Sequence, residues 1–154
     1  MRSDAPNPGL GLAILRVVTG VIFVAHGAPK LFGGGVEGLA GMLGNLGVPL
    51  ASVAAWGVTL LEFFGGLALI AGFLVAPVAV LLAVHMLMGI VLVHAGNGFY
   101  VVGPGQGGVE FNLILTASLL ALIFAGAGAA AVDNSLSGGG ATAGGDAGPE
   151  PGGG

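Results

Sequence analysis

Long apolar stretches, broken by short polar or glycine-rich segments, dominate the chain. A helix that crosses a bilayer needs about 20 mostly apolar residues. The pattern predicts four such spans, at about residues 11–31, 52–73, 77–95 and 110–131. Gly72 and Pro77 divide the longest apolar stretch, because glycine suits a helix end and proline suits the first turn of the next helix. We therefore expect an all-α fold: a polytopic membrane protein built as a four-helix transmembrane bundle.

The segments outside these spans predict less structure. Residues 1–9 are polar and predict a short solvated leader, and residues 137–154 are glycine-rich and predict a disordered tail. Between them we expect one membrane domain, residues 10–136. Within residues 33–50, apolar side chains recur at helical spacing, which fits a short helix lying in the membrane interface. An ordinary loop with scattered apolar residues explains the same pattern equally well.

The first apolar stretch has a second interpretation. Arg2, an apolar run and the small residues Ala25 and Gly27 together have the outline of a cleaved signal peptide. A spanning helix is favoured because Arg16 interrupts the run, and because the later stretches also belong in a membrane. Four spans place both termini on one side, and three cations carry little information on orientation. We expect a prokaryotic inner membrane with both termini in the cytoplasm.

Composition narrows the class further. Apolar residues make up 55% of the 154 residues and charged residues only 6%, against about 25% charged in an ordinary soluble domain. A water-facing globule is therefore excluded. The chain has no cysteine, which excludes disulfides, thiolate catalysis and zinc fingers. A net charge of −4 with three cations excludes a basic nucleic-acid surface. None of the glycine runs has the sequence of a phosphate-binding loop.

The few polar side chains within or beside the spans are the candidates for function. An ionisable group near the bilayer centre costs about 2.5–3.5 kcal/mol on insertion scales, and such groups usually face the bundle interior. Running the helices alternately up and down places Arg16 and Asp133 on the side of the termini, where they could form a charge pair. Glu62 and His85 fall near the middle. The opposite side receives His26, Lys30, His94, Glu110 and Asn112. This distribution predicts a polar pocket that opens away from the termini.

Glu62 is the hardest of these residues to explain as a structural one. It lies deep in its span, so it must be protonated or paired with a cation from another helix, most plausibly Lys30. Structural explanations stay open for the others. Arg16 and Lys30 could extend to the headgroups, and Glu110 could be an acidic residue favoured at a helix N-terminus.

The histidines raise a geometric difficulty. His85 and His94 are nine residues apart, which is about 180° around a regular helix. They cannot both face one pocket from such a helix, so either His94 lies beyond the helix end or His85 contacts a different neighbour. No pair of histidines or acids has the tight spacing typical of metal ligands, so we predict no metal site.

Several motifs, in order, resemble the DoxX family of small four-helix membrane proteins. The first span carries Arg16 and the segment HGAPKLFG at residues 26–33, similar to the family's HG-x-x-K-LFG signature. Glu62 lies in the second span. Glu110 and Phe111, in GGVEF at residues 107–111, begin the fourth, and GAGAAAVD follows at residues 126–133. The resemblance covers about residues 10–136.

The resemblance implies a redox-linked membrane subunit, tied to a quinone and to sulfur or oxidative-stress metabolism. A quinone head group would be bound by His26, Lys30, His85, His94 and Asn112. Glu62, Lys30, His26 and Glu110 would form the proton relay. Electrons would come from a partner, such as a soluble redox enzyme, or from the substrate. Whether the chain catalyses a reaction by itself stays open. Two alternatives also stay open: a non-enzymatic scaffold for soluble redox enzymes, and a small-solute or proton-coupled transporter, which would need a homodimer.

Overall fold

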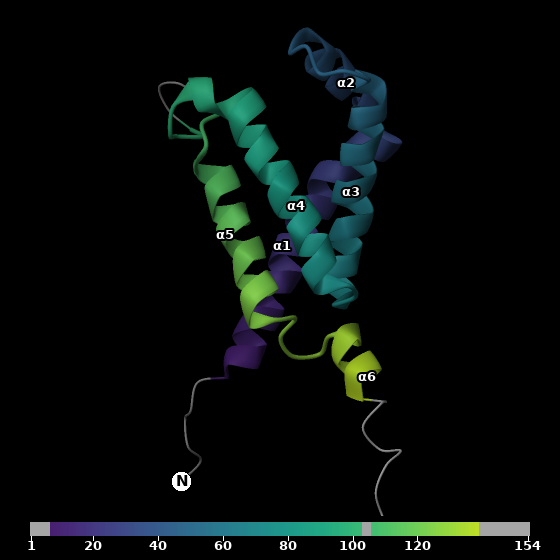
Figure 1. Ribbon diagram of the computed structural model, residues 1–154, viewed down its shortest axis with the longest axis vertical. Helices are drawn as coiled ribbons and strands as arrows, with labels where there is room; N and C mark the ends of the chain where they lie inside the picture. Colours follow the sequence, from purple (N-terminus) through teal and green to yellow (C-terminus); the bar gives the residue numbers. More distant parts are fainter. Residues whose placement is uncertain (1–6, 103–105, 139–154) are drawn as a thin grey trace, which may run out of the picture.

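The computed structural model describes residues 7–102 and 106–138 and is all-helical within these ranges (Figure 1). Three helical stretches are long and apolar enough to cross a membrane: Pro8–Phe32, Ala51–Ala71 and Val75–Asn97. A further apolar helix, Glu110–Ala125, is shorter. The elements are α1 (Pro8–Phe32), α2 (Gly35–Asn45), α3 (Ala51–Ala71), α4 (Val75–Gly89), the π-helical turn η1 (Ile90–His94), the 3-10 turn η2 (Ala95–Asn97), α5 (Glu110–Ala125) and α6 (Val132–Gly138). The predicted membrane helical bundle is confirmed.

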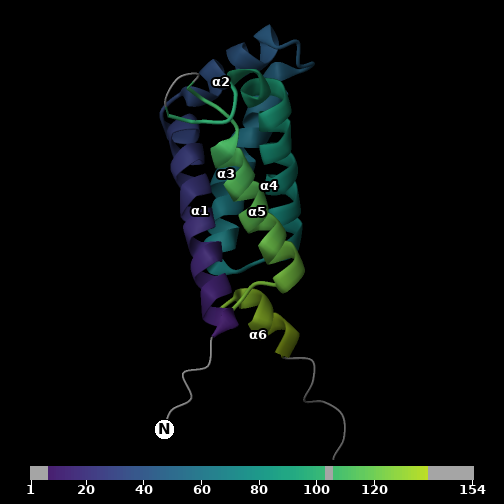
Figure 2. The same cartoon turned by 90° about the vertical axis from the view of Figure 1, so that its left-hand side faces the viewer.

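Helices α1, α3, α4 and the shorter α5 lie side by side along the long axis of the molecule (Figures 1 and 2). The beginning of α1, the α3–α4 turn and α6 lie at one end. Helix α2 and the turn η2 lie at the other end. Successive helices therefore run in opposite directions, as the sequence predicts, and the polar residues can be assigned to one end or the other.

Helix α1 begins earlier than the predicted residue 11. The Asn7 side chain accepts a hydrogen bond from the backbone N–H of Leu10 at 3.0 Å, and Pro8 occupies the first helical position. An asparagine cap and a proline at the first position both favour helix initiation. Part of the segment predicted as a polar leader is therefore the first turn of α1, whereas residues 1–6 lie outside the described residues.

The fourth span is shorter than the predicted 110–131. Helix α5 ends at Ala125, where Gly126 adopts φ 90°, and its 16 residues measure about 24 Å. Residues 126–131 instead turn back towards α1, and the backbone N–H of Ala129 bonds to the carbonyl of Gly9 at 2.8 Å. The short helix α6 follows, which the sequence pattern does not predict. Residues 139–154 of the predicted tail lie outside the described residues.

The segment between the first two spans forms a helix rather than a loop. In α2, the buried Val36 and Leu43 pack with Ala55 of α3, while Glu37 and Gly38 are exposed. This amphipathic pattern decides between the two interpretations of residues 33–50 in favour of the helix. The position of α2 in the membrane interface stays a prediction.

Glycines bring α1 and α3 into backbone contact. A Cβ atom added to Gly20 would lie 2.6 Å from the carbonyl oxygen of Gly66, and one added to Gly27 would lie 2.6 Å from the backbone nitrogen of Phe63. Small residues at a helix interface allow such an approach. Beside this contact lies the main apolar core, which includes Phe23, Leu69, Val75, Leu82, Leu115, Leu119 and Leu122.

Candidate functional site

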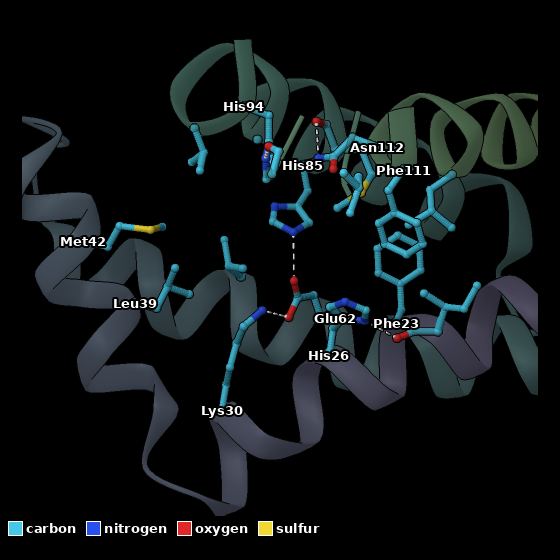
Figure 3. Close-up of a pocket in the computed structure, with 18 of the residues that line it drawn as sticks. Phe23, His26, Lys30, Leu39, Met42, Glu62, His85, His94, Phe111 and Asn112 are labelled. Atoms are coloured by element: carbon cyan, nitrogen blue, oxygen red, sulfur yellow. Dashed lines mark hydrogen bonds and ion pairs between the residues drawn. The ribbon is translucent and has the colours of Figure 1, made fainter. Parts of the chain in front are cut away.

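A cavity of about 540 Å³ lies in the half of the bundle away from the termini. Helices α1 to α5, η1 and the segment after η2 all contribute to its wall (Figure 3). Most of the lining is apolar, including Phe23, Leu39, Met42 and Phe111. Six polar side chains that the sequence singles out also line it: His26, Lys30, Glu62, His85, His94 and Asn112. The polar residues thus gather in one place, although the pocket is more apolar than the sequence analysis expects.

Glu62 lies at the centre of a three-helix polar cluster. Glu62 is only 4% exposed. Lys30 of α1 forms an ion pair with Oε2, and Nε2 of His85, from α4, lies 3.0 Å from Oε1 (Figure 3). Each carboxylate oxygen therefore has a partner, which a charge in an apolar interior requires. The prediction that Glu62 pairs with Lys30 is confirmed, and Lys30 does not extend to the headgroups. The bond to His85 was not predicted.

The structure places His85 and His94 on the same cavity, which a regular helix would not allow. The chain is π-helical over η1, and the backbone N–H of Ala95 bonds to the carbonyl of Ile90, five residues earlier. A π-helix turns less per residue than an α-helix, so it changes the direction in which the next side chains point. His94 consequently lines the cavity, and its Nδ1 bonds to the carbonyl of Gly107. His94 lies beyond the end of α4 at Gly89, as the first explanation offered from the sequence has it, but the π-helical turn itself was not predicted.

His26 and Asn112 complete the polar lining. Nδ1 of His26 lies 2.9 Å from the carbonyl oxygen of Ile22, and its ring stacks on Phe111 with centroids 5.8 Å apart. The buried Asn112 donates a hydrogen bond from Nδ2 to the carbonyl of Met86 at 3.3 Å. Both side chains are therefore held in fixed orientations by backbone carbonyls.

Glu110 differs from the other predicted relay residues because it is not among those that line the cavity. It begins α5, and its Oε1 accepts a hydrogen bond from the backbone N–H of Val101 at 2.7 Å. Backbone hydrogen bonds also join residues 98–101 to residues 107–110. Glu110 thus fastens the segment that closes this end of the bundle, and the geometry matches the structural alternative for this residue.

Arg16 and Asp133 lie at the other end of the bundle, around the Gly72 turn. Arg16 is 2% exposed and donates from Nη1 to the carbonyl of Ala127 at 2.8 Å and from Nη2 to that of Ala130 at 3.3 Å. It is therefore buried and does not extend to the headgroups. Asp133 accepts hydrogen bonds from the backbone N–H groups of Leu74 and Val75, at 2.8 and 2.9 Å.

These contacts indicate structural roles for Arg16 and Asp133. The carboxylate of Asp133 satisfies two free amides at the beginning of α4, and the Arg16 guanidinium holds residues 127–130 against α1. A direct charge pair between the two residues stays a prediction. The carbonyl partners of Arg16 were missed because the sequence places residues 126–131 in a helix, where those carbonyls would bond along the backbone.

Comparison with known proteins agrees with this arrangement. The model of the DoxX family matches residues 11–95. The chain is 31% identical to a Bacillus subtilis (strain 168) protein named "Putative oxidoreductase CatD", over 80% of this chain and 85% of that protein. It is 28% identical to "Inner membrane protein YphA" of Escherichia coli (strain K12), over 79% of this chain and 87% of that protein.

A third relative, from Haemophilus influenzae, is 32% identical over 80% of this chain and 88% of its own length. No solved structure is significantly similar to the chain. The family match covers more than half of the residues, and the relatives align over nearly their full length. The chain is therefore a membrane protein of the DoxX family.

Proposed function

We propose that the chain is a quinone-binding subunit of a redox system in a prokaryotic inner membrane, with both termini in the cytoplasm. The observation that carries the proposal is Glu62, bonded to Lys30 and His85 on the wall of a large apolar cavity. The names of two relatives, an oxidoreductase and an inner membrane protein, agree with it. The family resemblance points to sulfur or oxidative-stress metabolism as the setting.

The residues of the cavity fit a quinone head group. A volume of about 540 Å³ lies within the usual range for small-molecule sites, and Phe23 and Phe111 offer aromatic surface to a flat ring. Lys30 uses one N–H on Glu62 and has others for a ring oxygen. His26 is less suited to donate, because its Nδ1–H bonds to Ile22. Lys30 is therefore the proposed donor.

The polar cluster supplies a place for protons. A bound quinone would accept two electrons and two protons. In this chain, Oε1 of Glu62 and Nε2 of His85 share a hydrogen bond, along which a proton can move between carboxylate and imidazole. The chain has no cysteine, so we expect the electrons to come from a soluble redox enzyme or directly from the substrate.

Mass spectrometry of an organic extract tests this proposal. The wild-type protein, purified in mild detergent, is compared with Glu62→Gln and with Glu37→Gln, which changes an exposed carboxylate on α2 outside the cavity lining. We expect a stoichiometric quinone in the wild type and in Glu37→Gln, and its loss from a Glu62→Gln protein of unchanged helicity. Each protein is also incubated with added quinone, so that loss during purification does not affect the result.

Failure of the wild type to retain or take up a quinone would refute the proposal. If the wild-type protein binds no quinone but co-purifies with a soluble redox enzyme, that result would indicate the scaffold function. Flux of a small solute or of protons into liposomes that is lost in Glu62→Gln would indicate proton-coupled transport. The oligomeric state would then be measured, because this function would need a homodimer.

A further inference from the structure

Two cavity histidines are each tied to a backbone carbonyl through the same ring atom. Nδ1 of His94 bonds to the carbonyl of Gly107, and Nδ1 of His26 to that of Ile22. A carbonyl oxygen only accepts hydrogen bonds, so Nδ1 must carry the proton in both rings. In the neutral imidazole, Nε2 is then an acceptor and cannot donate. A neutral ring thus offers Nε2 as a hydrogen-bond acceptor at each of the two positions.

His94 is the more closely held of the two. It is half-buried, whereas His26 is exposed. The π-helical turn η1 directs it to the cavity, and the bond to Gly107 fixes its ring at the wall (Figure 3). Among the residues that the structure describes, none bonds to its Nε2. A π-helical turn, here between α4 and the 3-10 turn η2, is uncommon and often accompanies a functional site.

Glu62 is a second strong acceptor in the cavity, and each of its oxygens already receives one hydrogen bond, from Lys30 and from His85. At His94, a hydroxyl group on a ligand would find an acceptor to which no described residue bonds. A carbonyl group at the same place would gain nothing, because a neutral Nε2 has no hydrogen to give.

We propose that Nε2 of His94 accepts a hydrogen bond from a hydroxyl group on the ligand ring. His94 would then be a specificity-determining residue that favours the reduced, hydroxyl-bearing form of the ligand over its quinone form. This inference rests on the proposed function, because it assumes that a quinone or a related ring occupies the cavity.

Binding of three related probes tests the inference. Durohydroquinone carries two hydroxyl groups, its dimethyl ether carries none, and duroquinone is the oxidised form. The full-length protein in lipid nanodiscs is equilibrated with each probe under argon, and binding to empty nanodiscs is subtracted. One neutral hydrogen bond corresponds to about a fivefold change in Kd. We expect the wild type to bind durohydroquinone about fivefold more tightly than the ether.

Two substitutions separate the ring atoms of His94. In His94→Asn the side-chain amide can still donate to Gly107, but no atom remains at the position of Nε2. In His94→Gln the longer side chain places an amide oxygen near that position. We expect His94→Asn to lose the preference for durohydroquinone and to bind the ether and duroquinone as the wild type does. We expect His94→Gln to retain part of the preference.

The outcomes separate this inference from the function on which it rests. A preference that persists in His94→Asn would overturn the role of His94 and leave quinone binding intact. An equal loss of binding affinity for all three probes in His94→Asn would also overturn the inference, because His94 would then only shape the cavity. Failure of the wild type to bind any probe would refute the proposed function itself.

Discussion

Replacement of Lys30 by methionine is expected to destabilise the bundle through Glu62. Methionine retains much of the apolar stem of lysine but removes the cation, so the buried carboxylate keeps only His85. Removing one partner of a buried ion pair costs about 3–5 kcal/mol. The Lys30 side chain is 25% exposed, so water replaces part of the lost interaction. We therefore expect a loss of about 3 kcal/mol in the free energy of unfolding.

A second substitution identifies the carboxylate as the cause. Glu62→Gln removes the charge that Lys30→Met leaves unpaired, and its amide can still bond to His85. The double variant should recover at least about 1 kcal/mol relative to Lys30→Met alone, so the two effects are not additive. Glu62→Gln alone should lower the free energy of unfolding by less than Lys30→Met does, because the partly exposed Lys30 side chain can reorient towards water.

Reversible unfolding in mixed detergent micelles, followed by far-UV circular dichroism, measures these differences. Lys30→Arg keeps the cation and is the matched control, with an expected loss below about 1 kcal/mol. The reasoning would be refuted if Lys30→Met and Lys30→Arg were equally stable. It would also be refuted if the double variant lost the sum of the two single effects.

Two further predictions concern packing and capping. Gly20→Ala should lower the free energy of unfolding by about 1–3 kcal/mol, because its Cβ would meet the Gly66 carbonyl. A Cβ at Gly11 has nothing within 4 Å, so Gly11→Ala should be neutral or should stabilise α1 by up to about 1 kcal/mol. Equal thermal stabilities of these two variants would contradict the close approach of α1 and α3. Asp133→Ala should lower the free energy of unfolding by about 1 kcal/mol and speed amide exchange at Val75, and unchanged exchange there would argue against the cap.

The features that depend on the length and direction of helices could be predicted from the sequence. Apolar length determines where a chain can cross a bilayer, and each crossing takes the chain to the opposite side, so successive spans alternate up and down. These two rules alone place Glu62 near Lys30 and separate both from Arg16. They hold because the cost of an unpaired charge in an apolar interior leaves few arrangements open.

The features that depend on local irregularity could not be predicted. The way in which His85 and His94 reach one cavity stayed open, because no hydrophobic pattern distinguishes a π-helical turn from a regular one. Residues 126–131 are as apolar as a helix, and the positive φ of Gly126 is visible only in the structure. One missed feature did leave a signal: Gly20 and Gly27 are seven residues apart, so they share a helix face and indicate a close partner.

The contacts of Arg16 also bear on the order in which the protein is made. Arg16 lies in α1, whereas its carbonyl partners, Ala127 and Ala130, lie 111 and 114 residues later in the chain and are synthesised after α2 to α5. During synthesis the guanidinium therefore waits without these partners while α2 to α5 insert. A nascent chain that stops before residue 127 would expose a cation in its first span. Formation of the turn after α5 thus gives the buried guanidinium the hydrogen-bond acceptors that a charged group in an apolar interior needs.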